Sequence, residues 1–163
     1  MPEHTRWYDE VAFPALLRAA RSTYRSAVRD ALSDAGCDDL PRNGAYVIGG
    51  IARNGSPLSE IIQELGVSKQ AAGQLVDTIV IRGYLHRAPD PEDRRRLTVT
   101  LTERGHMAAS VVRAAVELVD SEVSTLVGVE YVAHARATLA ALIEAGRGHD
   151  AAGHVPDADT HNG

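Results

Sequence analysis

The sequence predicts a mainly α-helical protein with one small β-ribbon. Over most of the chain, apolar residues recur every three or four positions, which is the spacing of one face of an α-helix. Between Tyr84 and Leu101 this period changes to two, as expected for short strands. At 163 residues the chain is long enough for one domain with its own core, with or without an extension.

A long first helix is expected between Tyr8 and Ala35. Pro14 marks the point where it becomes regular, because proline is accepted in the first turn of a helix. A row of arginines lies about 100° around the axis from the apolar stripe, and we interpret it as a solvated face rather than an anion site. The stripe comprises Leu17, Ala20, Tyr24, Val28 and Ala31, and the row comprises Arg18, Arg21, Arg25 and Arg29.

Two short helices are expected next. The first opens at Pro41 and runs to about Ala52. It contains Gly49 and Gly50, which each cost about 1 kcal/mol relative to alanine and therefore predict close approach of a neighbouring backbone. The second begins near Ser59 and carries Ile61, Ile62 and Leu65.

The fourth helix is expected to begin after Ser68, whose hydroxyl is placed to cap it, and to reach Arg82, where Gly83 ends it. Its apolar positions predict a buried face formed by Ala72, Leu75, Val76, Ile79 and Val80. Its first two turns also present a polar face, formed by Lys69, Gln70, Gly73 and Gln74.

A β-ribbon and two further helices complete the expected elements. The strands begin at Tyr84 and Leu97, Thr102 caps the next helix, and the last helix follows Gly128. From residue 147 the composition offers almost nothing to bury, so a flexible tail is expected. The expected division is an N-terminal arm and helix (1–36), a central domain (37–102), two C-terminal helices (103–146) and the tail (147–163).

The net charge of −5 is unevenly distributed along the chain. Between Gly66 and His106, seven basic and five acidic residues give +2, so the remainder carries −7. Because phosphate attraction is screened within about 8 Å at physiological salt, local charge matters more to a polyanion than the total. The basic middle of the chain is therefore compatible with nucleic acid.

The order of elements from residue 41 to residue 101 is that of a winged helix-turn-helix. In this arrangement the helix from Leu58 to Leu65 braces the next helix, whose N-terminal side chains enter the major groove of DNA. Glutamine can pair with adenine and lysine with guanine, so such side chains offer sequence readout. The DNA contacts predicted on this helix are Ser68, Lys69, Gln70 and Gln74.

The loop between the strands holds three adjacent arginines in the run DPEDRRRL, residues 90 to 97. An exposed ribbon tip of this kind can reach an adjacent minor groove, where a narrow A·T-rich stretch concentrates negative potential. A neighbouring carboxylate can hold the plane of a guanidinium. A polar loop whose charges are only solvated is the alternative. The position after a capped helix favours a DNA-binding wing formed by Asp93, Arg94, Arg95 and Arg96.

Residues 65 to 105 resemble the core of the MarR family of transcriptional regulators. The resemblance rests on three motifs, Arg82-Gly83-Tyr84-Leu85, Asp93-Arg94-Arg95 and Leu101-Thr102-Glu103-Arg104-Gly105. In helix order it extends over roughly residues 8 to 146. It implies an obligate homodimer, paired through its first and last helices, with two wings on a pseudo-palindromic operator. The expected function is that of a ligand-responsive repressor, and an activator is the alternative.

The resemblance also assigns roles by position. Arg95 corresponds to the family's wing arginine and Asp93 to its partner. Gly73 and Gln74 stand where the family often has a hydroxylated or basic residue, so direct readout falls to fewer side chains. The family often binds small aromatic or amphipathic effectors between the dimer helices and the reading domain. The residues that match such a site, or equally an ordinary core tyrosine with surface arginines, are Trp7, Arg21, Tyr24 and Arg25.

Dimerisation is also expected from the residues themselves. The first helix and the two C-terminal helices each carry an apolar stripe, and together they are too numerous for a small winged domain to cover. Packing only on their own chain is the alternative. We predict a homodimer whose DNA half-sites lie about one helical turn, ~34 Å, apart.

Neither an enzyme nor a cofactor is expected, because the sequence holds no nucleophile elbow, phosphate loop or metal-ligand set. Cys37 stands beside Asp38 and Asp39, which disfavour a thiolate, so a structural cysteine is predicted rather than a redox switch. No apolar run approaches a membrane span, and the expected location is the cytoplasm. The alternative function is a winged helix that contacts only proteins.

Overall fold

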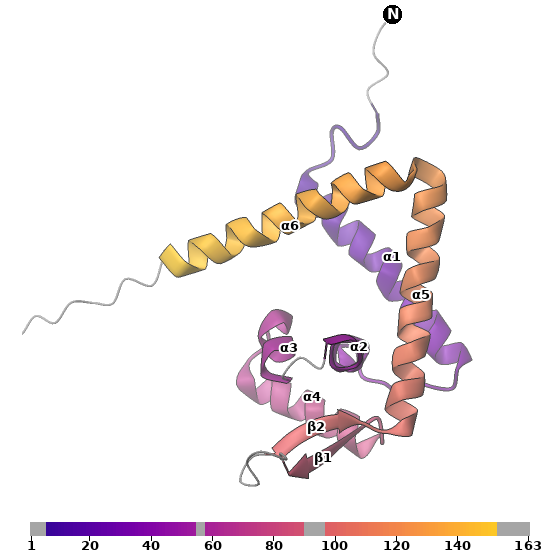
Figure 1. Cartoon of the computed structure of the whole chain (residues 1–163), viewed down its shortest axis with the longest axis vertical. Coiled ribbons are helices and arrows are strands. Elements are labelled where there is room, and N and C mark those ends of the chain that lie inside the picture. Colours follow the sequence, from indigo (N-terminus) through magenta and orange to yellow (C-terminus); the bar gives the residue numbers. More distant parts are fainter. Residues whose placement is uncertain (1–5, 55–57, 90–96, 153–163) are drawn as a thin grey trace, which may run out of the picture. The chain divides into compact units, whose positions relative to one another are not determined.

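The computed structural model describes residues 6–54, 58–89 and 97–152. Within these segments, helices and strands follow one another in the expected order, with a ribbon between the fourth and fifth helices (Figure 1). The predicted fold class, mainly α with a small β-ribbon in a winged helix-turn-helix, is confirmed. The elements are α1 (Phe13–Asp34), α2 (Gly44–Asn54), α3 (Leu58–Leu65), α4 (Lys69–Ile81), β1 (Leu85–Pro89), β2 (Leu97–Leu101), α5 (Glu103–Val127) and α6 (Val129–Ala152).

The chain divides into two compact units, residues 1–119 and 120–163. The first unit contains α1 to β2 and most of α5, and the second contains the end of α5 and all of α6. The sequence pattern instead suggested boundaries near residues 36 and 102. The difference arises because α1 and the first turns of α5 contribute Leu32 and Ala108 to the same core as the winged domain.

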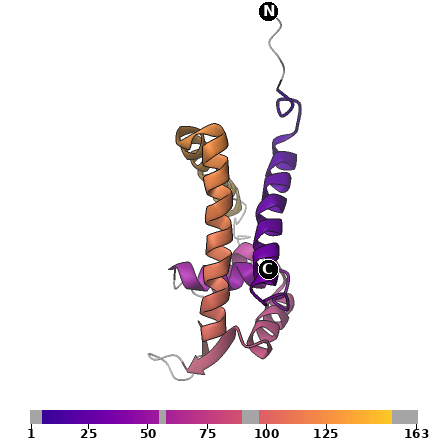
Figure 2. The same ribbon diagram turned by 90° about the vertical axis from the view of Figure 1, so that its right-hand side faces the viewer.

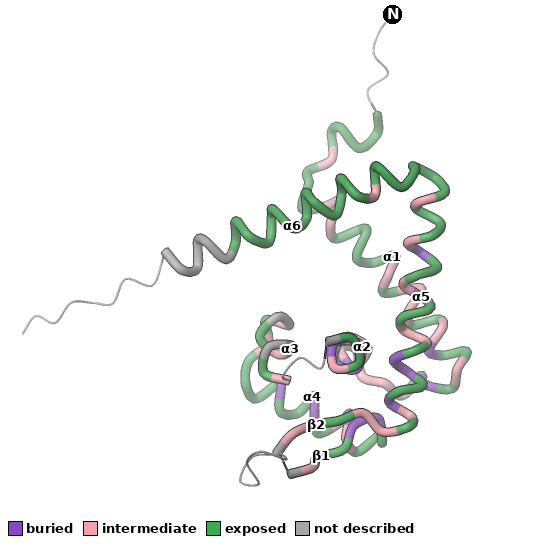
Figure 3. The backbone as a smooth tube through the Cα atoms, in the orientation of Figure 1, coloured by how far each residue is buried: buried purple, intermediate pink, exposed green. Residues whose placement is uncertain are grey.

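The core of the first unit forms where α2, α3, α4 and the ribbon meet the end of α1 and the start of α5. In Figure 3 the buried positions gather on α2, α4, β1 and the start of α5. Ala72, Val76 and Ile79 are buried on α4, and Leu75 and Val80 pack half-buried beside them, so the predicted inner face of this helix is confirmed. The largest side chains with almost no exposure are Tyr84, Ile48, Ile79, Leu85, Val47 and Cys37.

The two strands form an antiparallel ribbon that runs directly into α5 (Figure 2). Its register pairs Leu85 with Leu101 and Pro89 with Leu97. The side chain of Thr102 caps α5, because its Oγ1 accepts a hydrogen bond from the Gly105 amide at 3.0 Å. The same Oγ1 donates to the carbonyl oxygen of Gly83 at 2.6 Å, which connects the start of α5 to the turn that follows α4.

Glycine is required where α5 begins. A Cβ atom at Gly105 would collide with the backbone carbonyl oxygen of Tyr84, so only glycine lets the helix pass this close to the chain. The close backbone approach that was expected at Gly49 and Gly50 is not found there. The neighbour of Gly50 is instead a side chain, since a Cβ atom would lie 2.9 Å from Cδ1 of Ile61.

The last helix is longer than the sequence pattern indicated. α6 continues through Gly146 to Ala152, beyond residue 147 where the tail was expected to begin. This extension includes Gly148 and Asp150, which are poor helix formers, so helix propensity does not predict it. In the described part of the chain no single helix is long and apolar enough to cross a membrane, and only the broken pair of α5 and α6 meets that requirement by length and composition.

Candidate nucleic-acid interface

The start of α4 is held by the cap that the sequence predicted. Ser68 has extended backbone angles, and its Oγ accepts a hydrogen bond from the backbone amide of Ala71 at 3.2 Å. This bond satisfies one of the amide donors that every helix leaves unpaired at its first turn. The remaining amides and the helix dipole make this end of α4 favourable for an anion such as a phosphate.

The polar face predicted for α4 is exposed. Lys69, Gln70, Gly73 and Gln74 all lie at the surface, while the opposite side of the helix is buried in the core. Ser68 is exposed beside them. The helix therefore presents donors, acceptors and one positive charge over its first two turns, which are the groups needed to contact base edges and phosphates.

An ion pair that sequence analysis missed joins this face to the ribbon. Asp77 lies three residues beyond Gln74 on the exposed side of α4, and its Oδ1 accepts a hydrogen bond from the guanidinium of Arg87 on β1. Both side chains are about half exposed. The pair links β1 to α4 and compensates the negative charge of Asp77 beside the exposed polar face. The two residues are ten positions apart, on either side of a chain reversal, so no helical spacing signals the contact.

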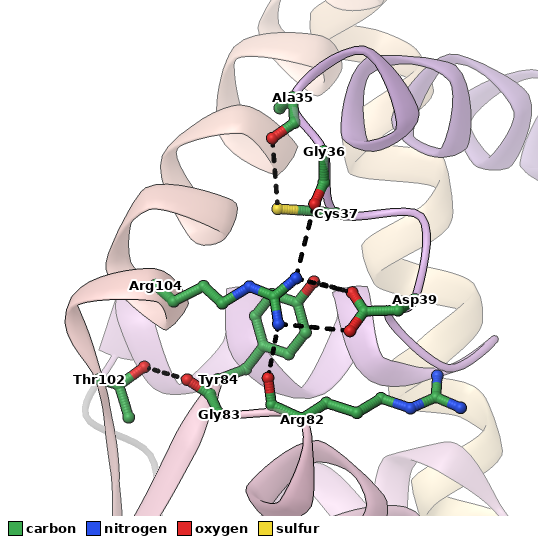
Figure 4. A network of polar contacts seen from close by, with 9 residues as sticks. All are labelled: Ala35, Gly36, Cys37, Asp39, Arg82, Gly83, Tyr84, Thr102 and Arg104. Carbon is green, nitrogen blue, oxygen red and sulfur yellow. Dashed lines mark hydrogen bonds and ion pairs between the residues drawn. The ribbon is translucent and has the colours of Figure 1, made fainter.

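A second polar network lies at the other end of α4 and centres on Tyr84 (Figure 4). The ring of Tyr84 is fully buried, and its hydroxyl donates a hydrogen bond of 2.5 Å to Oδ1 of Asp39 in the loop between α1 and α2. The guanidinium of Arg104 donates to both oxygens of Asp39, at 2.9 and 3.3 Å. It also stacks over the Tyr84 ring, 4.2 Å from the ring centroid.

Arg104 connects this network to the end of α4. Its Nη1 donates to the carbonyl oxygen of Arg82 at 2.6 Å, and its Nη2 donates to the carbonyl oxygen of Gly36 at 3.5 Å. A cation at the C-terminus of a helix is favourable because it meets unpaired carbonyls and the negative end of the dipole. One guanidinium thereby holds together the α1–α2 loop, the end of α4 and the start of α5.

The protonation states in this network follow from its contacts. Burial, together with the hydrogen bond to Asp39, raises the pKa of the Tyr84 hydroxyl, which stays a neutral donor. The hydrogen bond from Tyr84 is the main cause that lowers the pKa of the Asp39 carboxyl, with partial burial opposing it and Arg104 adding to it. At neutral pH the network therefore pairs a carboxylate with a guanidinium and a phenol.

Cys37 lies next to this network and inside the core. It is 1% exposed, and its Sγ is 3.8 Å from the carbonyl oxygen of Ala35. An inaccessible thiol of this kind packs as a small apolar side chain, as predicted for a structural cysteine.

The predicted wing residues Asp93, Arg94, Arg95 and Arg96 lie outside the described residues. Their contacts with DNA therefore remain a prediction. The described part of the ribbon ends at the pair Pro89 and Leu97, on either side of this loop.

The four residues predicted for an effector site come from two segments. Arg21 and Arg25 are exposed on α1, and Tyr24 is half-buried beside them, so these three share one side of the helix. Trp7 precedes α1, is 76% exposed and contacts Tyr8 edge-on at 5.6 Å between ring centroids. An effector site at these residues remains a prediction.

Comparison with known proteins identifies the fold. The sequence model of the MarR family matches residues 38–96, which confirms the resemblance over the helix-turn-helix and the first part of the ribbon. No curated protein matches the chain. Because the solved structures described next are less than 25% identical to it, they establish the fold alone.

Three solved structures illustrate this likeness. The S. aureus MepR in a complex with DNA is 15% identical with a TM-score of 0.66, over 83% of this chain and 99% of that chain. The transcription regulator MarR from Oenococcus oeni is 18% identical with a TM-score of 0.63, over 82% and 99%. The transcriptional repressor CouR, bound to a 23-mer DNA duplex, is 17% identical with a TM-score of 0.62, over 81% and 92%.

Proposed function

We propose that this chain, which has the fold of the MarR-family transcriptional regulators, is a homodimeric repressor that binds double-stranded DNA at a pseudo-palindromic operator and responds to a small aromatic or amphipathic effector. The observation that carries the DNA-binding part is the exposed polar face of α4. Its first two turns place Lys69, Gln70 and Gln74 at the surface, beside the Ser68 cap and opposite a fully packed inner face.

The solved relatives support DNA as the partner. MepR and CouR have this fold and were each solved with DNA. In a winged helix-turn-helix the second helix of the pair enters the major groove through its N-terminal residues. In this chain that helix is α4, and its first two turns are the exposed polar part.

The homodimer is supported by apolar surface in the second unit. No described side chain of residues 120–146 is fully buried, although this segment is rich in leucine, valine and isoleucine. Burial of such side chains against another copy would remove them from water. The most exposed large apolar residues of this segment are Leu126, Val127, Val129, Tyr131, Leu142 and Ile143.

The test is selection of binding sites from random DNA with the purified chain, followed by a salt titration on the selected duplex. We expect affinity to fall with salt with a log-log slope of about −0.9 for each phosphate contact. Lys69→Ala and Arg95→Ala should weaken binding. Arg18→Ala, an exposed arginine on α1 that removes the same charge elsewhere, should leave affinity within about twofold.

The competing function is a winged helix that contacts only proteins. It predicts no enriched sequence after selection and equal, weak binding to every duplex. Such a result, or equal affinities for the Lys69→Ala variant and the wild type on an enriched site, would contradict the proposal.

A further inference from the structure

The described helical glycines of the first unit differ in what surrounds them. A Cβ atom at Gly44 would lie 2.9 Å from the Leu40 side chain, and one at Gly50 would lie equally close to Ile61. Gly49 has Val112 at 3.8 Å, and Gly105 is pressed against the backbone at Tyr84. At each of these positions a neighbouring part of the protein occupies or borders the space that a side chain would take.

Gly73 is the exception among the described helical glycines of this unit. It lies in the interior of α4, it is exposed, and a Cβ atom there would meet no atom of the described residues within 4 Å. Glycine is among the least favourable residues in a helix interior, because it loses the most conformational freedom when the helix forms. Packing against the described part of the chain therefore gives no reason for glycine at this position.

The position of Gly73 suggests where the reason lies. It stands one turn after Lys69 and Gln70 and beside Gln74, in the middle of the exposed polar face of α4. Glycine occurs where a backbone must approach a ligand closely. We propose that Gly73 is a specificity-determining residue, at which the backbone of α4 comes closest to the duplex and the missing side chain leaves room for the DNA.

This inference rests on the proposed function and adds a specific geometry to it. A helix that lies deep in the major groove brings its polar side chains within reach of the base edges. This deep position is stable only on a duplex whose bases offer matching hydrogen-bond partners. On an unrelated duplex the protein is held mainly by phosphate contacts, which do not require this close approach. A side chain at position 73 should therefore weaken binding to the selected site and have little effect on non-specific binding.

The experiment compares the full-length wild type with Gly73→Ala and Gly73→Leu, both of which introduce strong helix formers. For Gly73→Ala we expect affinity for the selected duplex to fall by about tenfold to a hundredfold, the range for forcing a methyl group into a filled contact. Gly73→Leu should lose more. Affinity for an unrelated duplex should stay within about twofold. The Tm should rise by about 2–4 °C with Gly73→Ala, because helix propensity improves.

The matched control is Gly146→Ala. Gly146 is an exposed glycine in the interior of α6, and it also has nothing within 4 Å of its missing Cβ. Gly146 lies on the same face of α6 as Leu142 and Ile143, so both proteins are compared at a concentration where sedimentation shows them to be dimers. Under that condition the variant should raise the Tm similarly and leave both DNA affinities unchanged. The opposite directions of Tm and affinity for Gly73→Ala exclude unfolding as the cause of weaker binding.

Two outcomes would overturn the inference. One is an affinity of Gly73→Ala for the selected duplex within twofold of wild type, and the other is an equal loss on selected and unrelated duplexes. Failure of the proposed function has a separate signature, because the wild type would then show no preference for any duplex.

Discussion

At Arg104 one side chain contacts three segments that lie far apart in the sequence. Its guanidinium meets Asp39 from 65 residues away, the carbonyl of Arg82 from 22 residues away, and the ring of Tyr84. Planar, bidentate donation together with stacking is a combination that lysine cannot reproduce. The contacts are only partly shielded, since the Arg104 and Asp39 side chains are 38% and 40% exposed. Arg104 is therefore expected to stabilise the first unit moderately.

Arg104→Ala should lower the free energy of unfolding by about 1–2 kcal/mol, the value of charged hydrogen bonds discounted for solvent exposure. The stability of Arg104→Lys should fall between those of Arg104→Ala and the wild type, because lysine keeps the positive charge and loses the planar, bidentate donor group. Urea denaturation followed by circular dichroism measures both. The control is Arg113→Ala, whose pair with Glu117 at 3.9 Å is strongly exposed and should contribute less than about 0.5 kcal/mol. Equal effects at positions 104 and 113 would contradict the assigned role.

The pKa of Asp39 predicts how stability depends on pH. The pKa of this carboxyl is lowered in the folded state from its ordinary value of 3.8, chiefly by the hydrogen bond from Tyr84. Its stabilising contribution is therefore complete well above pH 3.8 and is lost as pH falls through the lower, folded pKa. Asp39→Asn should be less stable than wild type at neutral pH, and the two stabilities should converge in acid.

The measurement is urea denaturation of wild type and Asp39→Asn from pH 7 down to the most acidic pH at which both remain folded. Using the difference between the two proteins removes the contribution of other carboxyl groups. A stability difference that stays constant or grows toward acid would show that Asp39 is not the titrating group.

Among the single elements, α4 is stabilised differently at its two ends. The Ser68 cap holds the first turn while leaving the polar face open, and Gly83, with a φ of +75°, reverses the chain after the last turn. After this reversal, the Asp77–Arg87 ion pair connects β1 to α4. The core therefore supplies the main support of α4, and the half-exposed ion pair adds a weak link to β1 on its outer side.

Ser68→Ala should lower the free energy of unfolding by about 1 kcal/mol, because the Ala71 amide loses its acceptor at the helix start. Ser68→Asn should restore most of the loss, since asparagine is an equally good N-cap. Thermal unfolding at a fixed protein concentration measures both variants. Equal destabilisation by alanine and asparagine would indicate that Ser68 contributes something other than a cap.

At the scale of the whole molecule, the two units differ in how far they bury their own apolar residues. The first unit encloses a continuous core that includes Val47, Ile48, Ile79 and Leu85. In the second unit, Arg136 of α6 donates to Asp120 of α5 at 2.7 Å. The described apolar side chains of α6 stay partly or largely exposed. Exposed apolar surface on such a helix is what the proposed homodimer would cover.

Leu142→Glu should weaken this dimer, because Leu142 is 48% exposed on the apolar side of α6 and a charge there would have to be buried on association. Sedimentation equilibrium at micromolar concentration should show dimer for wild type and a shift toward monomer for the variant. Glu144→Ala, an exposed position roughly opposite on the helix, should remain dimeric. A wild-type monomer at this concentration would contradict the homodimer.

The amino-acid sequence was enough to predict the order of the elements, the Ser68 and Thr102 caps, and the inner and polar faces of α4. These features depend on residues within a turn or two of each other, where helical spacing and capping chemistry act directly. It did not reveal the close packing at Gly105 or the full length of α6. α6 extends past the point where apolar residues become scarce, into a segment whose Gly148 and Asp150 disfavour a helix.

Folding of the chain creates the Asp77–Arg87 pair and the network of Asp39, Tyr84 and Arg104. Their members are 10 to 65 residues apart along the chain, so no local period relates them. They meet because the chain reverses at Gly83 and because the core draws the ends of α1, α4 and α5 together. Local chemistry selects each helix and strand, whereas the long-range polar contacts exist only after apolar burial has brought distant segments into place.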